Sequence, residues 1–253
     1  MRIQLSVFFS ISMFFLSCDS ELENSPPVLH KIVEYSLSVI EPSGLTFDEK
    51  TSSLWTVSDQ TGKVVNIDTS GNVIRQIILP PFDLTLPDLE GITFNAELSE
   101  LLVINELNSS IVRISASGRI IESVRIMENP GLANNGLEGI CYKGDTKNYF
   151  LIKENDPKII IKTDSNLLEL ERFEVNFSND LSGIDYDAVS KTLWIVSESS
   201  RYVINCNLEG DEIRKYSIDS MAPEGIAIDP GNKKLYIVSD DNSTLGIFSI
   251  LDY

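Results

Sequence analysis

Five short stretches of this 253-residue sequence place a Ser or a Glu directly before a glycine and an apolar residue, as in "DLEGITF" and "GLEGICY". The residues at this place are Ser43, Glu90, Glu138, Ser182 and Glu224. Hydroxyl and carboxylate oxygens are the ligands that hard divalent cations take in proteins. Carboxylates that lie close together repel one another unless a cation sits among them. The pattern therefore predicts a metal site, provided that the fold gathers these residues.

Calcium fits this oxygen set better than magnesium or zinc. It accepts about 6–8 oxygen ligands in a forgiving geometry, whereas magnesium demands a near-ideal octahedron. Zinc prefers His or Cys, and the single histidine, His30, precedes the repeated stretches. The alternative is that each Glu-Gly-Ile stretch is only a tight turn entering a strand, with its acid in solvent.

A second acidic series follows the motif glycines at a constant offset of fifteen residues. Its members are Asp59, Glu106, Glu154, Glu198 and Asp240, and Lys153 is the one base among the residues directly before them. With Lys153, these acids are candidates for a ligand-binding mouth. Acids at strand ends also cap turns, and the sequence leaves both readings open.

The spacing of the motif reveals the fold that positions it. The glycines are Gly44, Gly91, Gly139, Gly183 and Gly225, at intervals of 47, 48, 44 and 42 residues. Each unit reads as four short strands rich in Ile, Val and aromatic residues, separated by polar turns. Four antiparallel strands per repeat of this length are typical of a propeller blade. We therefore predict an all-β, five-bladed β-propeller over residues 30–253.

The fifth unit ends at Tyr253 after three strands, and an orphan strand precedes the first motif at residues 31–40. We expect this N-terminal strand to complete the last blade and close the ring. Closure leaves no sheet edge on which another chain could add, so we expect a monomer.

The predicted blades explain how the two acidic series meet. The first strand of each blade lines the channel, and an antiparallel hairpin returns the end of the second strand to the same face. The motif glycine lets the backbone crowd toward the axis or adopt a positive φ. Turns between the third and fourth strands carry residues that tolerate positive φ, namely Gly71, Gly118, Asn166 and Gly210.

The first 17 residues read as a signal peptide, because a basic start precedes a short apolar run and a small residue. Their end, "FFLSCDS", resembles the lipobox of bacterial lipoproteins, which implies lipidation of Cys18. Residues 18–29 then form a lipidated cysteine and tether. The expected location is the cell envelope, with a lipid anchor in the membrane on either side of the periplasm or at the cell surface. Cleavage nearby with Cys18 unmodified is the alternative.

Composition limits the possible functions. A net charge of −18, from 38 acids and 20 bases, argues against nucleic-acid binding. One histidine leaves no general base for Ser-His-Asp or Cys-His catalysis. Cys141 and Cys206 fall on different predicted strands, so we expect two buried thiols rather than a disulfide.

On these motifs the chain resembles the SdiA-regulated (YjiK-like) family over residues 30–250, which implies an envelope propeller with bound calcium and no settled activity. The Ser, Glu, Glu, Ser, Glu order also resembles the calcium-activated nucleotidases (apyrases), which implies that those five residues hold calcium on the axis. A looser similarity is to phytase-like esterases.

We expect a calcium-binding lipoprotein that binds a small molecule or a protein at its acidic channel face. The alternative is a calcium-dependent phosphate-ester hydrolase. A purely structural disc with no metal is the third reading.

Overall fold

The computed structural model describes residues 25–79, 88–126 and 136–250 of the chain. Within these ranges it contains twenty β-strands and one short 3-10 helix, Glu106–Asn108, so the fold is all-β as predicted. The predicted signal peptide, Cys18 and the first part of the tether lie outside the described residues. In the described ranges, no helix has the length and apolar character needed to cross a bilayer.

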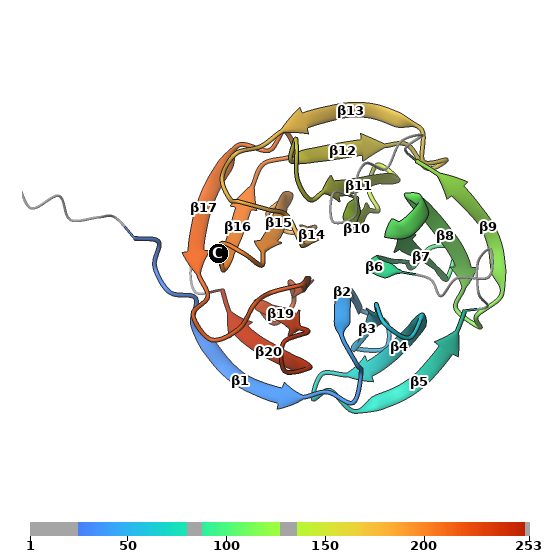
Figure 1. Cartoon of the computed structure of the whole chain (residues 1–253), viewed down its shortest axis with the longest axis horizontal. Helices are drawn as coiled ribbons and strands as arrows, with labels where there is room; N and C mark the ends of the chain where they lie inside the picture. The colour runs from blue at the N-terminus through green and yellow to red at the C-terminus, as the bar shows by residue number, and fades with distance from the viewer. Residues whose placement is uncertain (1–24, 80–87, 127–135, 251–253) are drawn as a thin grey trace, which may run out of the picture.

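The strands form five antiparallel four-stranded sheets that surround a central axis like the blades of a propeller (Figure 1). Blades 1 and 2 consist of β2 (Pro42–Asp48), β3 (Ser53–Ser58), β4 (Lys63–Asp68) and β5 (Val73–Ile78), then β6 (Leu89–Asn95), β7 (Glu100–Asn105), β8 (Ser110–Ser115) and β9 (Ile120–Arg125). Blades 3 and 4 consist of β10 (Leu137–Lys143), β11 (Asn148–Lys153), β12 (Ile159–Thr163) and β13 (Glu169–Glu174), then β14 (Gly183–Asp187), β15 (Thr192–Ser197), β16 (Tyr202–Cys206) and β17 (Glu212–Ser217). Blade 5 consists of β18 (Gly225–Asp229), β19 (Lys234–Ser239), β20 (Thr244–Ser249) and β1 (Lys31–Ser36).

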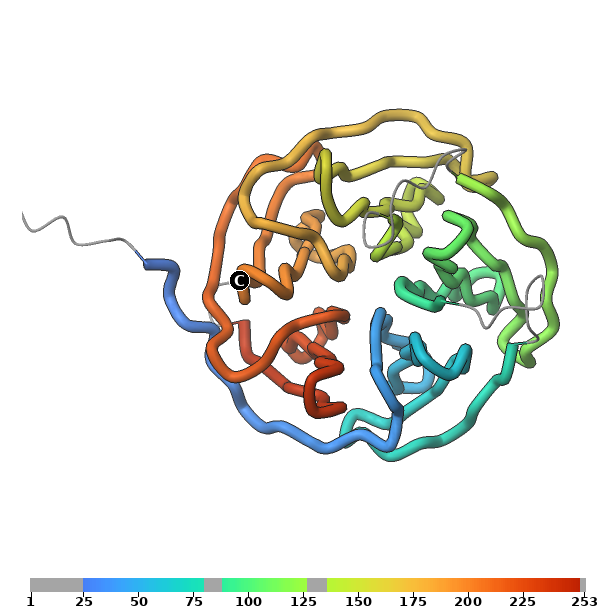
Figure 2. Tube along the Cα trace, in the orientation of Figure 1, coloured from blue at the N-terminus to red at the C-terminus, as the bar shows by residue number. Residues whose placement is uncertain are grey.

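The N-terminal strand closes the ring, as the sequence predicts. β1 pairs antiparallel with β20, with Tyr35 opposite Leu245, so the blue segment that contains β1 lies beside the red C-terminal strands (Figure 2). The backbone N–H of Leu29 also donates to the carbonyl of Ser217, at 2.9 Å. Leu29, one residue before the predicted boundary at residue 30, therefore contacts blade 4.

Apolar clusters between neighbouring blades fix where the inner strands lie. Leu45 of blade 1, for example, packs in one buried cluster with Tyr236 and Val238 of blade 5. Inner strands such as β11 are buried on both faces and read as continuous apolar runs, whereas the outermost strand β13 is charged and exposed. Cys141 and Cys206 are free thiols in the core beside blades 3 and 4, as expected.

The motif glycines let the first strands approach the axis. A Cβ on Gly44 would lie 2.3 Å from the carbonyl oxygen of Glu90, and one on Gly225 would lie 2.7 Å from the carbonyl carbon of Gly44. Neither glycine has a positive φ. Close backbone approach, rather than unusual dihedral angles, is therefore the reason for glycine at these positions.

Positive φ occurs instead in the outer turns. Gly71, Gly118 and Gly210 have φ of 82°, 92° and 87°, as predicted. In blade 3 the prediction of Asn166 is wrong, because Leu167 takes the left-handed conformation with φ of 64°. The Leu167 side chain is buried between blades 2 and 3, and that burial offsets the backbone cost.

Candidate functional site at the acidic channel mouth

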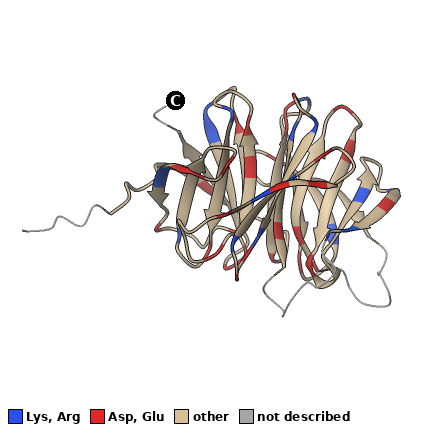
Figure 3. Cartoon of the chain, turned by 90° about the horizontal axis from the view of Figure 1, so that it is seen from above, with Lys and Arg blue, Asp and Glu red and all other residues tan. Residues whose placement is uncertain are grey.

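Seen from the edge, the molecule is a disc that the strands cross from one face to the other (Figure 3). The start of each first strand and the end of each second strand lie at one of these faces, at the mouth of the axial channel. Backbone hydrogen bonds join the two: Asp59 N donates to Glu41 O at 3.1 Å, and Glu106 N donates to Asp88 O at 2.9 Å. The hairpins thus bring both acidic series to one face.

A cavity of about 260 Å³ occupies this mouth. Eleven carboxylates and two hydroxyls line it, from Glu41, Ser43, Asp59, Asp88, Glu90, Glu106, Glu138, Glu154, Asp180, Ser182, Glu198, Glu224 and Asp240. Among these described lining residues there is no Lys, Arg or His. We call this cavity the acidic mouth.

Ten of the eleven site residues predicted from the sequence line the acidic mouth, and Lys153 does not. The Lys153 ammonium donates to the backbone carbonyl of Asn155 instead. No turn N–H within the described residues donates to the side chains of Asp59, Glu154 or Asp240. These strand-end acids therefore face the cavity rather than cap their turns.

Three lining acids were missed by the sequence reasoning: Glu41, Asp88 and Asp180. Each lies two residues before a motif Ser or Glu, a place that Gly136 and Ala222 take in the other two units. The sequence therefore contains a third series of aligned acids, but two of its five positions hold Gly136 and Ala222 instead of an acid.

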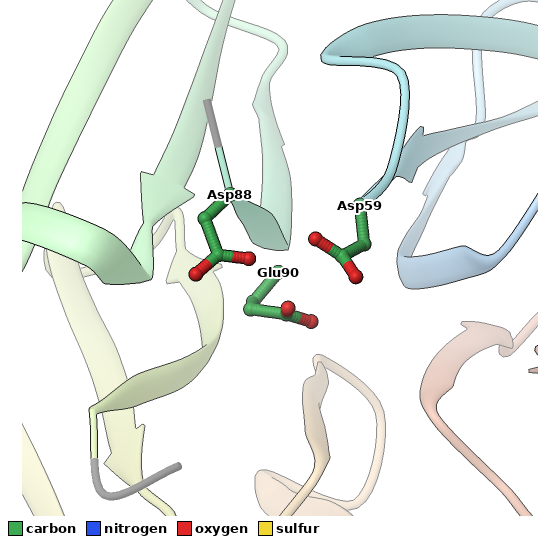
Figure 4. Close-up of side chains that lie close together, drawn as sticks. All are labelled: Asp59, Asp88 and Glu90. Carbon is green, nitrogen blue, oxygen red and sulfur yellow. The ribbon is translucent and has the colours of Figure 1, made fainter. Parts of the chain in front are cut away.

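The closest oxygen groups form between blades rather than among the five axial residues alone. Carboxylate oxygens of Asp59, Asp88 and Glu90 all lie within 4.8 Å of one another, and the three side chains point toward a common space (Figure 4). Ser43 Oγ donates to Glu90 Oε2 at 2.6 Å. Blades 1 and 2 thus hold one candidate cation site.

A second such group joins blades 2 and 3. Its carboxylates come from Glu106, Glu138 and Glu154, also within 4.8 Å of one another. Gly136 N donates to Glu106 Oε1 at 3.0 Å, and a Cβ on Gly136 would lie 2.3 Å from Glu106 Cγ. The exception at residue 136 therefore makes room for the Glu106 carboxylate.

Blade 4 departs from this pattern. The Asp180 carboxylate accepts hydrogen bonds from the Ser197 hydroxyl and from Ser199 N, the latter at 2.9 Å. Ser182 Oγ donates to the carbonyl of Pro223 at 2.7 Å. These contacts hold the loop before β14 in place, so the Asp180 carboxylate is less available to a cation.

Burial and the closeness of other carboxylates raise the pKa of several carboxyl groups in the acidic mouth. Burial, reinforced by the neighbouring carboxylates, raises the pKa of Glu224 to about 9. Burial raises the pKa of Glu90 to about 8, against the opposing effect of the hydrogen bond from Ser43. Burial and the charges of neighbouring glutamates raise the pKa of Glu138 well above its usual value. Without a bound cation, these buried carboxyl groups of the acidic mouth are therefore protonated at neutral pH.

A closed ring of five four-stranded antiparallel sheets around an axial cavity defines the chain as a five-bladed β-propeller. Residues 30–245 match the family model described as SdiA-regulated, and the chain belongs to this family.

Solved propellers share the fold at low sequence identity. Virginiamycin B lyase from Staphylococcus aureus is 20% identical with a TM-score of 0.52 over 83% of this chain, which spans 66% of that lyase. A luciferin-regenerating enzyme is 14% identical with a TM-score of 0.55, over 89% of this chain and 96% of the other. A chain from a nidogen/laminin complex is 17% identical with a TM-score of 0.57, over 78% and 72%. These similarities show the fold alone.

Proposed function

We propose that the protein is a calcium-binding propeller that binds a ligand or a protein partner at the acidic mouth. The observation that carries this proposal is one cavity lined by eleven carboxylates with no base among its described lining residues. Such a charge is stable only if protons or cations neutralise it. At neutral pH a divalent cation neutralises more charge than a proton and gains several oxygen ligands at once.

The residues present fit a hard cation. Asp59, Asp88 and Glu90 offer one carboxylate group each at the boundary of blades 1 and 2, and blades 2 and 3 repeat the arrangement. Glu154 Oε2 and Asp240 Oδ1 are buried and accept no hydrogen bond from the described residues. Buried carboxylate oxygens without donors are costly unless a cation satisfies them. A bound calcium would keep positions open for oxygen atoms of a ligand.

A calcium-dependent phosphate-ester hydrolase is the rival function. Phosphate transfer needs positive groups around the developing charge, and no Lys or Arg of the described residues lines this cavity. Lys153, the one base predicted there, turns to a backbone carbonyl instead. The geometry therefore favours binding over hydrolysis.

Thermal unfolding in calcium and in chelator tests the proposal. Saturation at about 100 times Kd stabilises a protein by ~2.7 kcal/mol, which corresponds to a rise in Tm of about 5–10 °C at this size. Glu138→Gln should reduce the rise, whereas Glu209→Gln, at an exposed turn, should not. Identical melting curves in excess calcium and in chelator would reject calcium binding. Calcium-dependent phosphate release from nucleoside diphosphates or phytate would favour the hydrolase.

We also propose that lipidation of Cys18 anchors the protein in the cell envelope, on the strength of the lipobox-like "FFLSCDS". Cys18→Ser should move the protein from the detergent-soluble membrane fraction to the aqueous fraction. Equal partitioning of both forms would contradict the anchor and leave the calcium proposal untouched.

A further inference from the structure

A second cavity, of about 350 Å³, lies where the first strands end, at the face opposite the acidic mouth. Its walls come from the ends of the first strands and the turns that follow them, in all five blades. β2, for example, starts beside the acidic mouth with Ser43 and reaches this second cavity with Thr46 and Phe47. The two cavities therefore occupy opposite ends of one channel.

Aromatic side chains line this second cavity. Phe47, Phe94, Tyr142 and Tyr186 each stand three residues after a motif glycine, and Ile228 takes that place in blade 5. All four rings are partly exposed and packed on one side against the blade cores. We call this cavity the aromatic mouth.

Asp185 is one of four carboxylates that line this cavity, with Glu49, Glu97 and Asp145. Asp185 lies two residues after its motif glycine, where blades 1 and 2 have Thr46 and Thr93. Asp185 Oδ2 accepts from Ile228 N at 2.8 Å, and the Thr46 hydroxyl accepts from Phe94 N in the same way, at 3.4 Å. A hydroxyl thus suffices for this contact between blades. The contact between blades therefore does not by itself require a carboxylate at residue 185.

No Lys, Arg or His in the described part of the chain forms an ion pair with Asp185, whose other hydrogen bond comes from its neighbour Tyr186 N at 2.9 Å. By contrast, Glu97 of the same cavity pairs with Lys147, at 2.9 Å. A buried carboxylate that receives only backbone N–H groups keeps lone pairs for a further donor. A charged donor would form the stronger bond.

The ring faces at this mouth attract ammonium groups. Lys143 Nζ lies 5.3 Å from the centre of the Tyr186 ring while its charge pairs with Asp145. A cation within about 6 Å of a ring centre is attracted by the ring's quadrupole. The chain itself therefore already places one ammonium group beside this aromatic wall.

We propose that the aromatic mouth binds an organic cation, with its ammonium group on Asp185 and its apolar body against the aromatic rings. An anionic ligand would meet the carboxylates of Asp185 and the exposed Glu49, while the ammonium of Lys50, the one lining base, donates to the carbonyl of Ala96 at 2.7 Å. A neutral ligand would contact the rings and leave the carboxylate unused. This site does not depend on calcium at the other mouth.

Calorimetric titration with benzylammonium, and with benzyl alcohol as its neutral match, tests the proposal. The ammonium compound should bind at least tenfold more tightly, because a charge-assisted hydrogen bond contributes about 1.5–3 kcal/mol. Asp185→Thr keeps an acceptor for Ile228 N and removes the charge, and should weaken benzylammonium binding about tenfold. The exposed Glu209→Gln should not change it. Equal affinity of both compounds, or of wild type and Asp185→Thr, would overturn the proposal.

A second variant tests the proposal independently, in case Asp185→Thr does not fold. Phe94→Leu keeps an apolar side chain and removes a ring face, so benzylammonium affinity should fall about two- to fivefold. Unchanged affinity in this variant would overturn the role of the rings. If Glu138→Gln abolished benzylammonium binding while Asp185→Thr and Phe94→Leu did not change it, the cation would bind at the acidic mouth. That result would overturn the assignment to the aromatic mouth.

Discussion

The two ends of the channel are built from the same five strands and carry different side chains. The acidic mouth holds eleven carboxylates and no base among its described lining residues, whereas four aromatic rings, four carboxylates and one lysine line the other end. Packing between blades places both ends of each first strand on the axis. The scaffold thus decides where side chains gather, and the residue type at each repeat position decides what they bind.

Departures from the repeat are informative at both mouths. At the acidic mouth, Gly136 replaces an acid and gives its space to Glu106. At the aromatic mouth, Asp185 replaces a threonine and adds a charge that the contact between blades does not need. Five-fold repetition builds the two cavities, and single exceptions change the local chemistry of each.

The largest expected effect comes from disturbing the glycine ring that both mouths share. In Gly44→Ala the new Cβ would meet backbone atoms of blade 2, at 2.3 Å from Glu90 O. Backbone cannot yield as a side chain can, so we expect a loss of about 3 kcal/mol or more in the free energy of unfolding, measured in urea. Calcium and benzylammonium binding should both weaken.

Gly144→Ala is the matched control, because its Cβ would meet only Tyr142 Cε1 at 3.5 Å, an ordinary contact. It should unfold at the urea concentration of wild type. Equal losses in both variants would show that the axis is not closely packed and that the two mouths are not built on one frame.

The five-bladed fold was predictable because the repeat is strict. The offsets from glycine to acid hold in every unit, and each blade has the predicted strand order. The missing fourth strand of blade 5 also identified β1 as its completion. Equal spacing along the chain becomes equal position around an axis, so ten of the eleven predicted site residues line one cavity.

The features that the sequence did not predict depend on side-chain conformations, which the spacing of the repeat does not determine. Lys153 has the right place in the repeat, yet its ammonium reaches the carbonyl of Asn155. Asp88 and Asp180 share a repeat position, but Asp180 accepts hydrogen bonds from the loop after β15 while Asp88 joins a carboxylate cluster. The turn at Leu167 is set by burial of its side chain between blades. Such choices follow from local packing.

The pH dependence of stability separates the two mouths. An acid with a raised pKa in the folded protein stabilises it fully below the unfolded value, and this stability is lost as pH rises through the folded value. The pKa of Glu224 rises from 4.5 to about 9, and that of Asp185 from 3.8 to about 7, both mainly through burial. In chelator, the free energy of unfolding should therefore fall as the pH rises from 5 to 9.

Calcium should remove the part of this slope that comes from the acidic mouth, because the cation replaces the protons. The part from Asp185 should remain in calcium, end near pH 7 and disappear in Asp185→Thr. Urea unfolding at each pH measures both. A slope that calcium abolishes completely in wild type would contradict a separate titrating group at the aromatic mouth.

Asp88→Asn tests the boundary between blades 1 and 2. The substitution removes one of the three carboxylates whose oxygens lie within 4.8 Å of one another, so calcium affinity should fall about tenfold, equivalent to ~1.4 kcal/mol. Calorimetric titration with calcium measures it, with the exposed Asp219→Asn as control. Unchanged affinity in Asp88→Asn would move the cation to Glu106, Glu138 and Glu154.

The smallest expected effect is the dependence of ligand affinity on salt. It compares how strongly each mouth relies on long-range electrostatic attraction. Raising ionic strength from 0.01 to 0.1 M shortens the Debye length from about 30 to about 10 Å. Calcium is drawn by the summed charge of eleven carboxylates, so its affinity should fall about tenfold over this range. Benzylammonium gains mainly from Asp185 and the adjoining rings at contact distance, which salt screens little, so its affinity should fall only about twofold. If the affinities for calcium and benzylammonium fell equally with ionic strength, both cations would respond to the same electrostatic field of the protein. The two mouths would then differ in shape rather than in charge.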